Sequence, residues 1–138
     1  MEQDCVVIDA TLWLHAFQKG KHDRFIKLAA DFNIIICTCP ELTDEVCRNL
    51  LHNPYFKKTI NNPQEHIDFF EEVTFNQTIE KRFDRAAGLK DNFLFDLAYT
   101  VKSFHIVTSE TRLLNMKQVN KIQIVSPTAY FGMFNIAW

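Results

Sequence analysis

The sequence has 138 residues, of which 47% are hydrophobic and 23% are charged. A domain usually has about 100–200 residues, so we expect one domain spanning residues 1–138. This composition excludes a disordered or low-complexity chain. The 15 Lys and Arg against 17 Asp and Glu leave a formal net charge of −2. That balance excludes a protein held on nucleic acid mainly by a basic surface.

The sequence pattern predicts neither export nor a membrane span. No apolar run approaches the roughly 18 residues that cross a membrane, and Glu2 to Asp4 lack the basic start of a signal peptide. We therefore expect a cytoplasmic protein that does not contact a membrane. The cysteines lack the C-x-x-C spacing of common zinc sites, so we expect reduced, buried thiols at Cys5, Cys37, Cys39 and Cys47.

Apolar runs and amphipathic stretches alternate through the first half of the chain. Cys5 to Ile8 is a continuous apolar run, typical of a strand buried on both faces. An apolar stripe then predicts a helix over 10–18, and a second helix is expected over 23–31. A strand over 33–37 leads to a helix over 40–51 that begins at Pro40, a residue suited to the first helical position. A polar linker is expected over 53–62.

The same alternation continues through the second half. A helix begins at Pro63, a strand follows over 73–75, and a clear apolar stripe predicts a helix over 91–102. A strand over 104–108, a helical turn over 110–115, a strand over 122–125 and a helix from Pro127 complete the chain. This alternation indicates a three-layer α/β/α fold: a parallel, twisted sheet of about five strands with helices on both faces.

Four carboxylates fall at strand ends or on the first turns of helices. In open α/β sheets, ligands bind at the carboxyl ends of the strands, so we expect these side chains to converge on one rim. They are Asp9, Glu45, Asp91 and Glu110. Oxygen ligands of this kind suit the hard cations Mg²⁺ and Mn²⁺. Two such ions can hold the attacking and leaving oxygens of a phosphodiester.

Each acid also has a simpler interpretation. Asp9 and Asp91 are at positions where aspartate caps a helix, Glu45 suits a solvated helix face, and Glu110 suits the start of a helix. Asp96 lies about 140° around its helix from Asp91, so we expect it on the surface. The histidines are spread over separate elements without the i, i+4 pairing of a zinc helix, and we expect surface or satisfied core positions for His15, His22, His52, His66 and His105.

Several segments together resemble the PIN domain, a metal-dependent nuclease fold named after the PilT N-terminus. Residues 6–11 (VVIDAT) resemble its opening V-V-x-D-T-N, and residues 90–98 (KDNFLFDLA) resemble K-D-N-x-x-L-x-L-A. Residues 39–45 followed by 53–57 resemble an S-x-x-x-x-x-E helix and an R-P-x-F segment. Residues 106–114 (IVTSETRLL) resemble V-T-G-D-x-x-L-L, and 124–127 (IVSP) resemble I-V-T-P. The resemblance extends in order over nearly the whole chain.

The resemblance is strongest to PIN proteins that form the toxin component of bacterial toxin–antitoxin pairs, VapC-like in the broad sense. It implies a Mg²⁺- or Mn²⁺-dependent endoribonuclease that hydrolyses RNA phosphodiester bonds. Asp9, Glu45 and Asp91 would be the main metal ligands, with Glu110 as the fourth acid. Thr11 and Thr108 would supply hydroxyls beside them. The expected partners are an RNA substrate, a small antitoxin protein and a second copy of the chain.

Basic residues near the predicted site are candidates for holding the RNA backbone. They are Lys57, Lys58, Lys90 and Arg112. The apolar C-terminal residues, Phe131 to Trp138, either contribute to a homodimer contact or pack on the core.

Two departures from the family pattern leave a second function open. Glu110 replaces the aspartate of the family and is one methylene longer, and Thr11 replaces asparagine or serine. The alternative is a catalytically weakened PIN-fold protein that acts as an RNA- or protein-binding module. A phosphoaspartyl hydrolase is excluded, because Thr11 stands where its second aspartate would be required.

Overall fold

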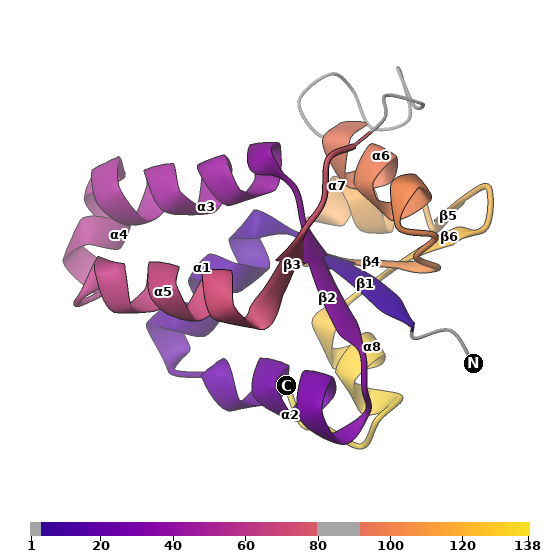
Figure 1. Cartoon of the computed structure of the whole chain (residues 1–138), viewed down its shortest axis with the longest axis horizontal. Helices are drawn as coiled ribbons and strands as arrows, with labels where there is room; N and C mark the ends of the chain where they lie inside the picture. Colours follow the sequence, from indigo (N-terminus) through magenta and orange to yellow (C-terminus); the bar gives the residue numbers. More distant parts are fainter. Residues whose placement is uncertain (1–3, 80–91) are drawn as a thin grey trace.

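The computed structural model describes residues 4–79 and 92–138, and in this part of the chain it has an α/β architecture. A six-stranded sheet has the order β3-β2-β1-β4-β6-β5 (Figure 1). Every pairing is parallel except that of β5 with β6. The strands are β1 (Cys5–Ile8), β2 (Ile35–Thr38), β3 (Thr74–Asn76), β4 (His105–Val107), β5 (Gln118–Val119) and β6 (Ile122–Val125). The predicted parallel sheet is confirmed, with one strand more than expected.

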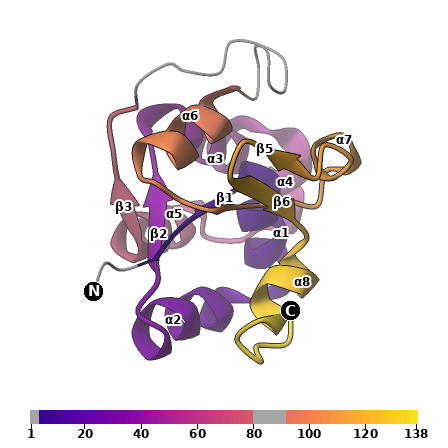
Figure 2. The same ribbon diagram turned by 90° about the vertical axis from the view of Figure 1, so that its right-hand side faces the viewer.

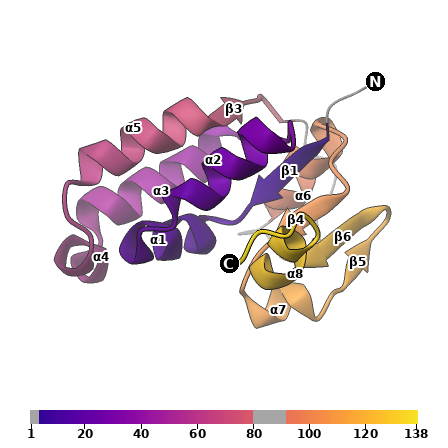
Figure 3. The same ribbon diagram turned by 90° about the horizontal axis from the view of Figure 1, so that it is seen from below.

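The described helices lie on both sides of the sheet. Helices α1, α2, α3 and α5 lie on one side and α6 on the other, as Figures 2 and 3 show from two directions. This arrangement is compatible with the predicted three-layer α/β/α fold. The helices are α1 (Ala10–Lys19), α2 (His22–Asp31), α3 (Pro40–His52), α4 (Pro54–Thr59), α5 (Pro63–Val73), α6 (Asn92–Thr100), α7 (Thr111–Leu114) and α8 (Pro127–Gly132). None of these helices is long and apolar enough to cross a membrane.

Aromatic side chains fill the core on the α1 side of the sheet. The Trp13 ring stacks on Phe25 with centroids 4.2 Å apart and meets the edge of Phe70 at 4.8 Å. Its indole N–H donates a 3.2 Å hydrogen bond to the carbonyl of Ile8, so the buried polar atom is satisfied. This cluster fixes α1 against the end of β1, where Asp9 connects the two elements.

The C-terminal residues contribute to the same core. Phe131 is fully buried, and the Trp138 ring stacks on it at a centroid distance of 4.9 Å. Ile136 is also buried, whereas Met133 is 57% exposed. Of the two interpretations of this segment, packing on the core accounts for most of its apolar residues.

Two elements differ from the sequence-based expectation. The linker expected over 53–62 contains the helix α4. The Asn53 side chain caps the start of this helix by accepting a 3.0 Å hydrogen bond from the Tyr55 N–H, and Pro54 occupies the first helical position. Strand β5 was not predicted. It is two residues long and pairs with β6 through a turn in which Asn120 has φ 54°. Both elements are too short to produce a periodic hydrophobic pattern.

The cysteines are all free thiols, as predicted. Cys37 and Cys39 are buried, while Cys5 and Cys47 are half-buried. Burial raises the pKa of Cys37 to about 12 and that of Cys39 to about 11. Both thiols are therefore protonated and unreactive at neutral pH.

Candidate functional site

The sheet topology singles out the carboxyl ends of β1 and β4. The chain leaves β1 toward β2 and β3 on one side, and leaves β4 toward β6 on the other, although β1 and β4 are neighbours. Such a reversal is a topological switch point, where the connecting segments diverge and open a crevice. Asp9 follows β1 directly, and Thr108 follows β4.

Thr108 connects the two strand ends through its hydroxyl. Its Oγ1 donates a 2.8 Å hydrogen bond to Oδ2 of Asp9 and accepts a 3.0 Å bond from the backbone N–H of Glu110. Thr108 is fully buried and Asp9 is 5% exposed. The Thr108 hydroxyl therefore orients the Asp9 carboxylate and the start of the Glu110 segment together, which agrees with its predicted place beside the acids.

Three of the four predicted acids are close enough to influence one another. The pKa of Asp9 is raised from 3.8 to about 6, chiefly because burial disfavours the charged carboxylate. The Thr108 hydrogen bond lowers this pKa, whereas the negative charges of Glu45 and Glu110 raise it. The structure therefore brings Asp9, Glu45 and Glu110, from three separate elements, toward one rim.

The three carboxylates differ in their surroundings. Asp9 is buried, Glu45 is half-buried on α3, and the Glu110 side chain is 41% exposed at the start of α7. Oε1 of Glu110 lies 3.5 Å from Nε of Arg112. Arg112, predicted as an RNA contact, thus lies at the edge of the acid cluster, where its charge faces Glu110.

A purely helix-capping role does not account for Asp9 or Glu110. Asp9 occupies the N-cap position of α1 and Glu110 that of α7, but neither side chain makes a capping hydrogen bond. The backbone carbonyl of Asp9 begins α1 by accepting bonds from Leu12 and Trp13, which leaves its carboxylate directed to Thr108. The simpler interpretation of Asp9 as a capping side chain is therefore wrong. Glu110 does stand at the start of a helix, as its simpler interpretation expects, but its side chain does not cap that helix.

The other predicted site residues are exposed or fall outside the described residues. Asp91 and Lys90 fall outside the described residues. Thr11 is exposed on the first turn of α1. Lys57 and Lys58 are exposed on α4, which lies at the end of α3 away from the sheet (Figure 1).

Asp96 is not on the surface, contrary to the expectation from its helical offset. It is 4% exposed, because α6 is enclosed by β1, β4 and β6 and by α3. Asp96 lies on the covered part of α6, whereas Tyr99 on the same helix is 49% exposed, so the angular offset from Asp91 alone does not report exposure. The charge of Asp96 contributes to raising the pKa of Cys39, which places this acid near the end of β2. The sequence analysis did not predict that Asp96 is buried. The apolar residues on both sides of it, in residues 93–98, are the pattern that indicates its burial.

Two histidines that the sequence separates meet in space. Nε2 of His22 lies 2.9 Å from Nδ1 of His66, and the two rings stack on each other. His66 also stacks on Phe17, and His22 meets Phe69 edge to face. The two rings thus provide a hydrogen-bond partner for each other within the aromatic cluster. Within residues 4–79 and 92–138, no group of three or more His, Cys, Asp or Glu side chains is close enough to hold a metal ion.

Comparison with known proteins leaves the family of this chain undecided. No protein-family model and no curated protein matches it. The PIN resemblance therefore remains a prediction based on short sequence segments. The chemistry of the site has to be inferred from its own geometry: a buried acid with a raised pKa, two further carboxylates near it, and an arginine at the edge.

Proposed function

We propose that this protein is a Mg²⁺- or Mn²⁺-dependent endoribonuclease with a PIN-like fold. The observation that carries this proposal is Asp9, a buried acid at the switch point whose pKa is raised to about 6 by burial and by the charges of Glu45 and Glu110. Carboxylates held together in this way repel one another unless a cation neutralises them. Acids with perturbed pKa values at the carboxyl ends of strands are candidates for functional sites.

The donor set suits a hard divalent cation in kind and in charge. Carboxylate oxygens are the ligands that Mg²⁺ and Mn²⁺ favour. Asp9, Glu45 and Glu110 would contribute to holding the ion, and Asp91 is the proposed further ligand, since the described acids do not form a metal-binding group by themselves. When bound, the ion would neutralise charge on a phosphodiester and lower the pKa of a water molecule.

The side chains of this protein have separate tasks in that reaction. The Thr108 hydroxyl keeps Oδ2 of Asp9 in one orientation, so that the carboxylate does not have to reorganise during the reaction. Arg112 lies beside Glu110 and can hold a phosphate of the substrate. Lys57, Lys58 and Lys90 are proposed to attract the RNA backbone farther from the acids.

As in the toxins that the sequence resembles, the proposed biological role is cleavage of cellular RNA under the control of a small antitoxin protein. A homodimer is proposed as well, with Met133 as an exposed apolar residue of the C-terminal segment. The antitoxin is tested by co-expression with a small adjacent reading frame, and the homodimer by the molar mass of the purified protein in solution. Inhibition of cleavage in the co-purified complex supports the toxin assignment, and unchanged cleavage opposes it.

The second candidate function is a catalytically weakened RNA- or protein-binding module. The observation that favours it is the ion contact between Glu110 and Arg112, 3.5 Å long, which partly neutralises one of the converging acids without a metal. In this case RNA or a protein partner would bind, but addition of Mn²⁺ would produce no cleavage.

A cleavage assay distinguishes the two functions. Purified protein is incubated with labelled single-stranded RNA in Mn²⁺, in Mg²⁺ or in EDTA, and Asp9→Asn is compared with wild type. Asp44→Asn is the matched control, because Asp44 precedes Glu45 but is exposed and pairs with Arg48 at 2.7 Å. We expect metal-dependent cleavage that Asp9→Asn abolishes and Asp44→Asn retains. Wild-type protein that binds RNA without cleaving it in either metal would establish the binding module instead.

A further inference from the structure

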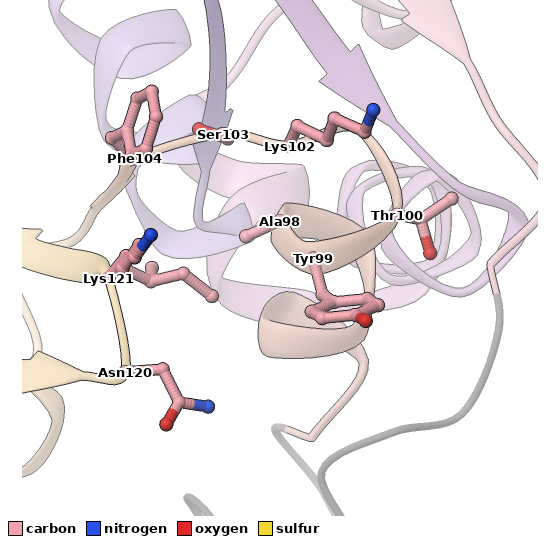
Figure 4. A pocket seen from close by; sticks show the side chains of 9 residues that line it. Ala98, Tyr99, Thr100, Lys102, Ser103, Phe104, Asn120 and Lys121 are labelled. Carbon is pink, nitrogen blue, oxygen red and sulfur yellow. The ribbon is translucent and has the colours of Figure 1, made fainter.

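A second concave surface lies at the opposite edge of the sheet, where β4 and β6 begin. It has a volume of about 660 Å³ and is formed by the end of α6, the segment that leads into β4 and the turn between β5 and β6 (Figure 4). This volume is within the range of small-ligand sites. Four residue steps along β4, from Phe104 to Thr108, separate this pocket from the acid rim by about 13 Å.

Among the described residues, the charged side chains that line this pocket are both positive. They are Lys102 and Lys121, and no carboxylate of residues 4–79 or 92–138 lines it. Two other pockets on the described surface differ in this respect: Glu72 lines one, and Asp44 and Glu71 line the other. In a chain with net charge −2, this pocket is therefore a local site of positive charge suited to an anion.

Two large aromatic side chains line the same pocket. Tyr99 is 49% exposed and Phe104 is 55% exposed. In Figure 4 the Tyr99 ring stands on the α6 side of the opening, with Phe104 and Lys121 on the strand side. Aromatic faces beside lysines are the combination with which proteins bind unstacked nucleobases and the phosphates next to them.

Lys102 occupies a backbone position that glycine usually takes. The N–H of Ser103 donates to the carbonyl of Ala98, and the N–H of Lys102 to that of Tyr99, which is the hydrogen-bond pattern of a Schellman helix end. Lys102 has φ 57°, in the left-handed region. The fold thus places a cation at the rim of the pocket on a residue whose conformation is strained.

We infer that this pocket binds a nucleotide of single-stranded RNA, an inference that rests on the proposed function. The base lies against the Phe104 ring, and Lys102 and Lys121 hold the phosphates that flank it. The Asn120 side chain, on the facing turn, is placed to hydrogen-bond the edge of the base. A duplex does not fit this role, because its bases are stacked and paired and their faces are inaccessible. One RNA strand then contacts the protein both at this pocket, where β4 and β6 begin, and at the acid rim, where β1 and β4 end.

The test measures RNA binding in EDTA, where metal-dependent cleavage does not occur. Fluorescence anisotropy of end-labelled single-stranded RNA is recorded for the full-length wild type, for Phe104→Ala and for the Lys102→Gln/Lys121→Gln double variant. Exposed residues outside the pocket provide matched controls: Phe75→Ala, which removes a ring that is 60% exposed, and Lys27→Gln on α2. Thermal unfolding of each variant confirms that it is folded.

We expect Phe104→Ala to weaken binding about tenfold, in line with the loss of one stacked base. The double lysine variant should weaken it as well and reduce the slope of log affinity against log salt by about 1.4, because each lost phosphate contact contributes about 0.7. Both controls should bind as wild type does. Wild-type affinity in both pocket variants would overturn the inference and leave the pocket to a protein partner. Equal affinity for duplex RNA, or displacement of the strand by equimolar free nucleotide, would also overturn it.

Failure of this inference is distinguishable from failure of the proposed function. If the pocket variants lose binding while wild-type protein cleaves nothing in Mn²⁺, the RNA site stands and the nuclease proposal fails. If wild-type protein cleaves RNA and the pocket variants bind normally, the acid rim stands and the pocket is not an RNA site.

Discussion

The hydroxyl of Thr108 donates a 2.8 Å hydrogen bond to the carboxylate of Asp9, across 99 positions of sequence. Because β1 and β4 are neighbouring parallel strands, the residues that follow them meet at the same edge of the sheet. The bond gives the buried acid one orientation and partly opposes the rise in its pKa. The variants Asp9→Asn and Thr108→Val test this contact directly.

Replacing Asp9 by Asn should abolish cleavage and stabilise the fold at neutral pH. The pKa of Asp9 is about 6 in the fold and 3.8 without its surroundings, so protonated Asp9 stabilises the protein below about pH 4 and this contribution is lost as pH rises through about 6. Asn remains uncharged at every pH. We expect the free energy of unfolding at pH 7 to increase by about 1–3 kcal/mol. Urea unfolding between pH 4 and pH 7 measures this, and an unchanged pH profile would contradict it.

Replacing Thr108 by Val should raise the pKa of Asp9 above about 6, because the hydrogen bond that favours its charged form is lost. The variant also leaves the backbone N–H of Glu110 without its hydroxyl acceptor, so the free energy of unfolding should fall by about 1–3 kcal/mol. Carboxyl NMR titration measures the first effect and urea unfolding the second. Thr108→Ser keeps the hydroxyl and should keep both values near wild type.

Replacing Glu110 by Asp should raise cleavage supported by Mg²⁺. Glutamate extends its carboxylate farther than aspartate, and a misplacement of about 1 Å can reduce a rate about 100-fold. Mg²⁺ requires near-ideal octahedral geometry, whereas Mn²⁺ binds such ligands more tightly, so wild type should prefer Mn²⁺. Cleavage rates against metal concentration test this for both ions. If the rate and the metal preference are both unchanged, Glu110 is not a ligand.

Acidification should destabilise the contact between His22 and His66. Burial lowers the pKa of both imidazole rings, although the negative charges of Asp23 and Glu65 oppose these shifts. If both rings were protonated, two positive charges would face each other at 2.9 Å. The neutral pair therefore makes its full contribution to the free energy of unfolding above about pH 6.5. This contribution is lost as the pH falls through the lowered pKa values of the two rings. The His22→Gln/His66→Gln double variant should lose this pH dependence in urea unfolding. A profile identical to that of wild type would contradict the prediction.

Replacing Lys102 by Gly should stabilise the protein and weaken its RNA binding. Glycine adopts the left-handed conformation at the end of α6 without strain, so we expect a gain of about 0.5–1 kcal/mol in the free energy of unfolding. Removal of the ammonium group should at the same time weaken binding of single-stranded RNA in EDTA. Thermal unfolding and anisotropy on one preparation measure both. A loss of stability would mean that the Lys102 side chain has structural contacts.

Local pattern in the sequence determined most of the architecture. Apolar runs such as Cys5 to Ile8 predicted the buried parallel strands, and Pro40, Pro63 and Pro127 marked helix starts that the structure confirms. The position of Asp9 directly after a buried strand was also enough to predict an acid at the sheet edge. These features depend on hydrophobic periodicity over a few residues and on the restricted backbone of proline. Both can be recognised from neighbouring residues in the sequence.

Tertiary structure alone decided which side chains meet and which are buried. Asp96 is buried because α6 is enclosed by strands and by α3, and no angular offset on one helix reports what covers its far side. His22 and His66 meet because α2 and α5 pack together, and Thr108 reaches Asp9 because β4 inserts beside β1. Contacts of this kind depend on strand order and helix packing, which are set by interactions between segments distant in sequence, and no local pattern encodes them.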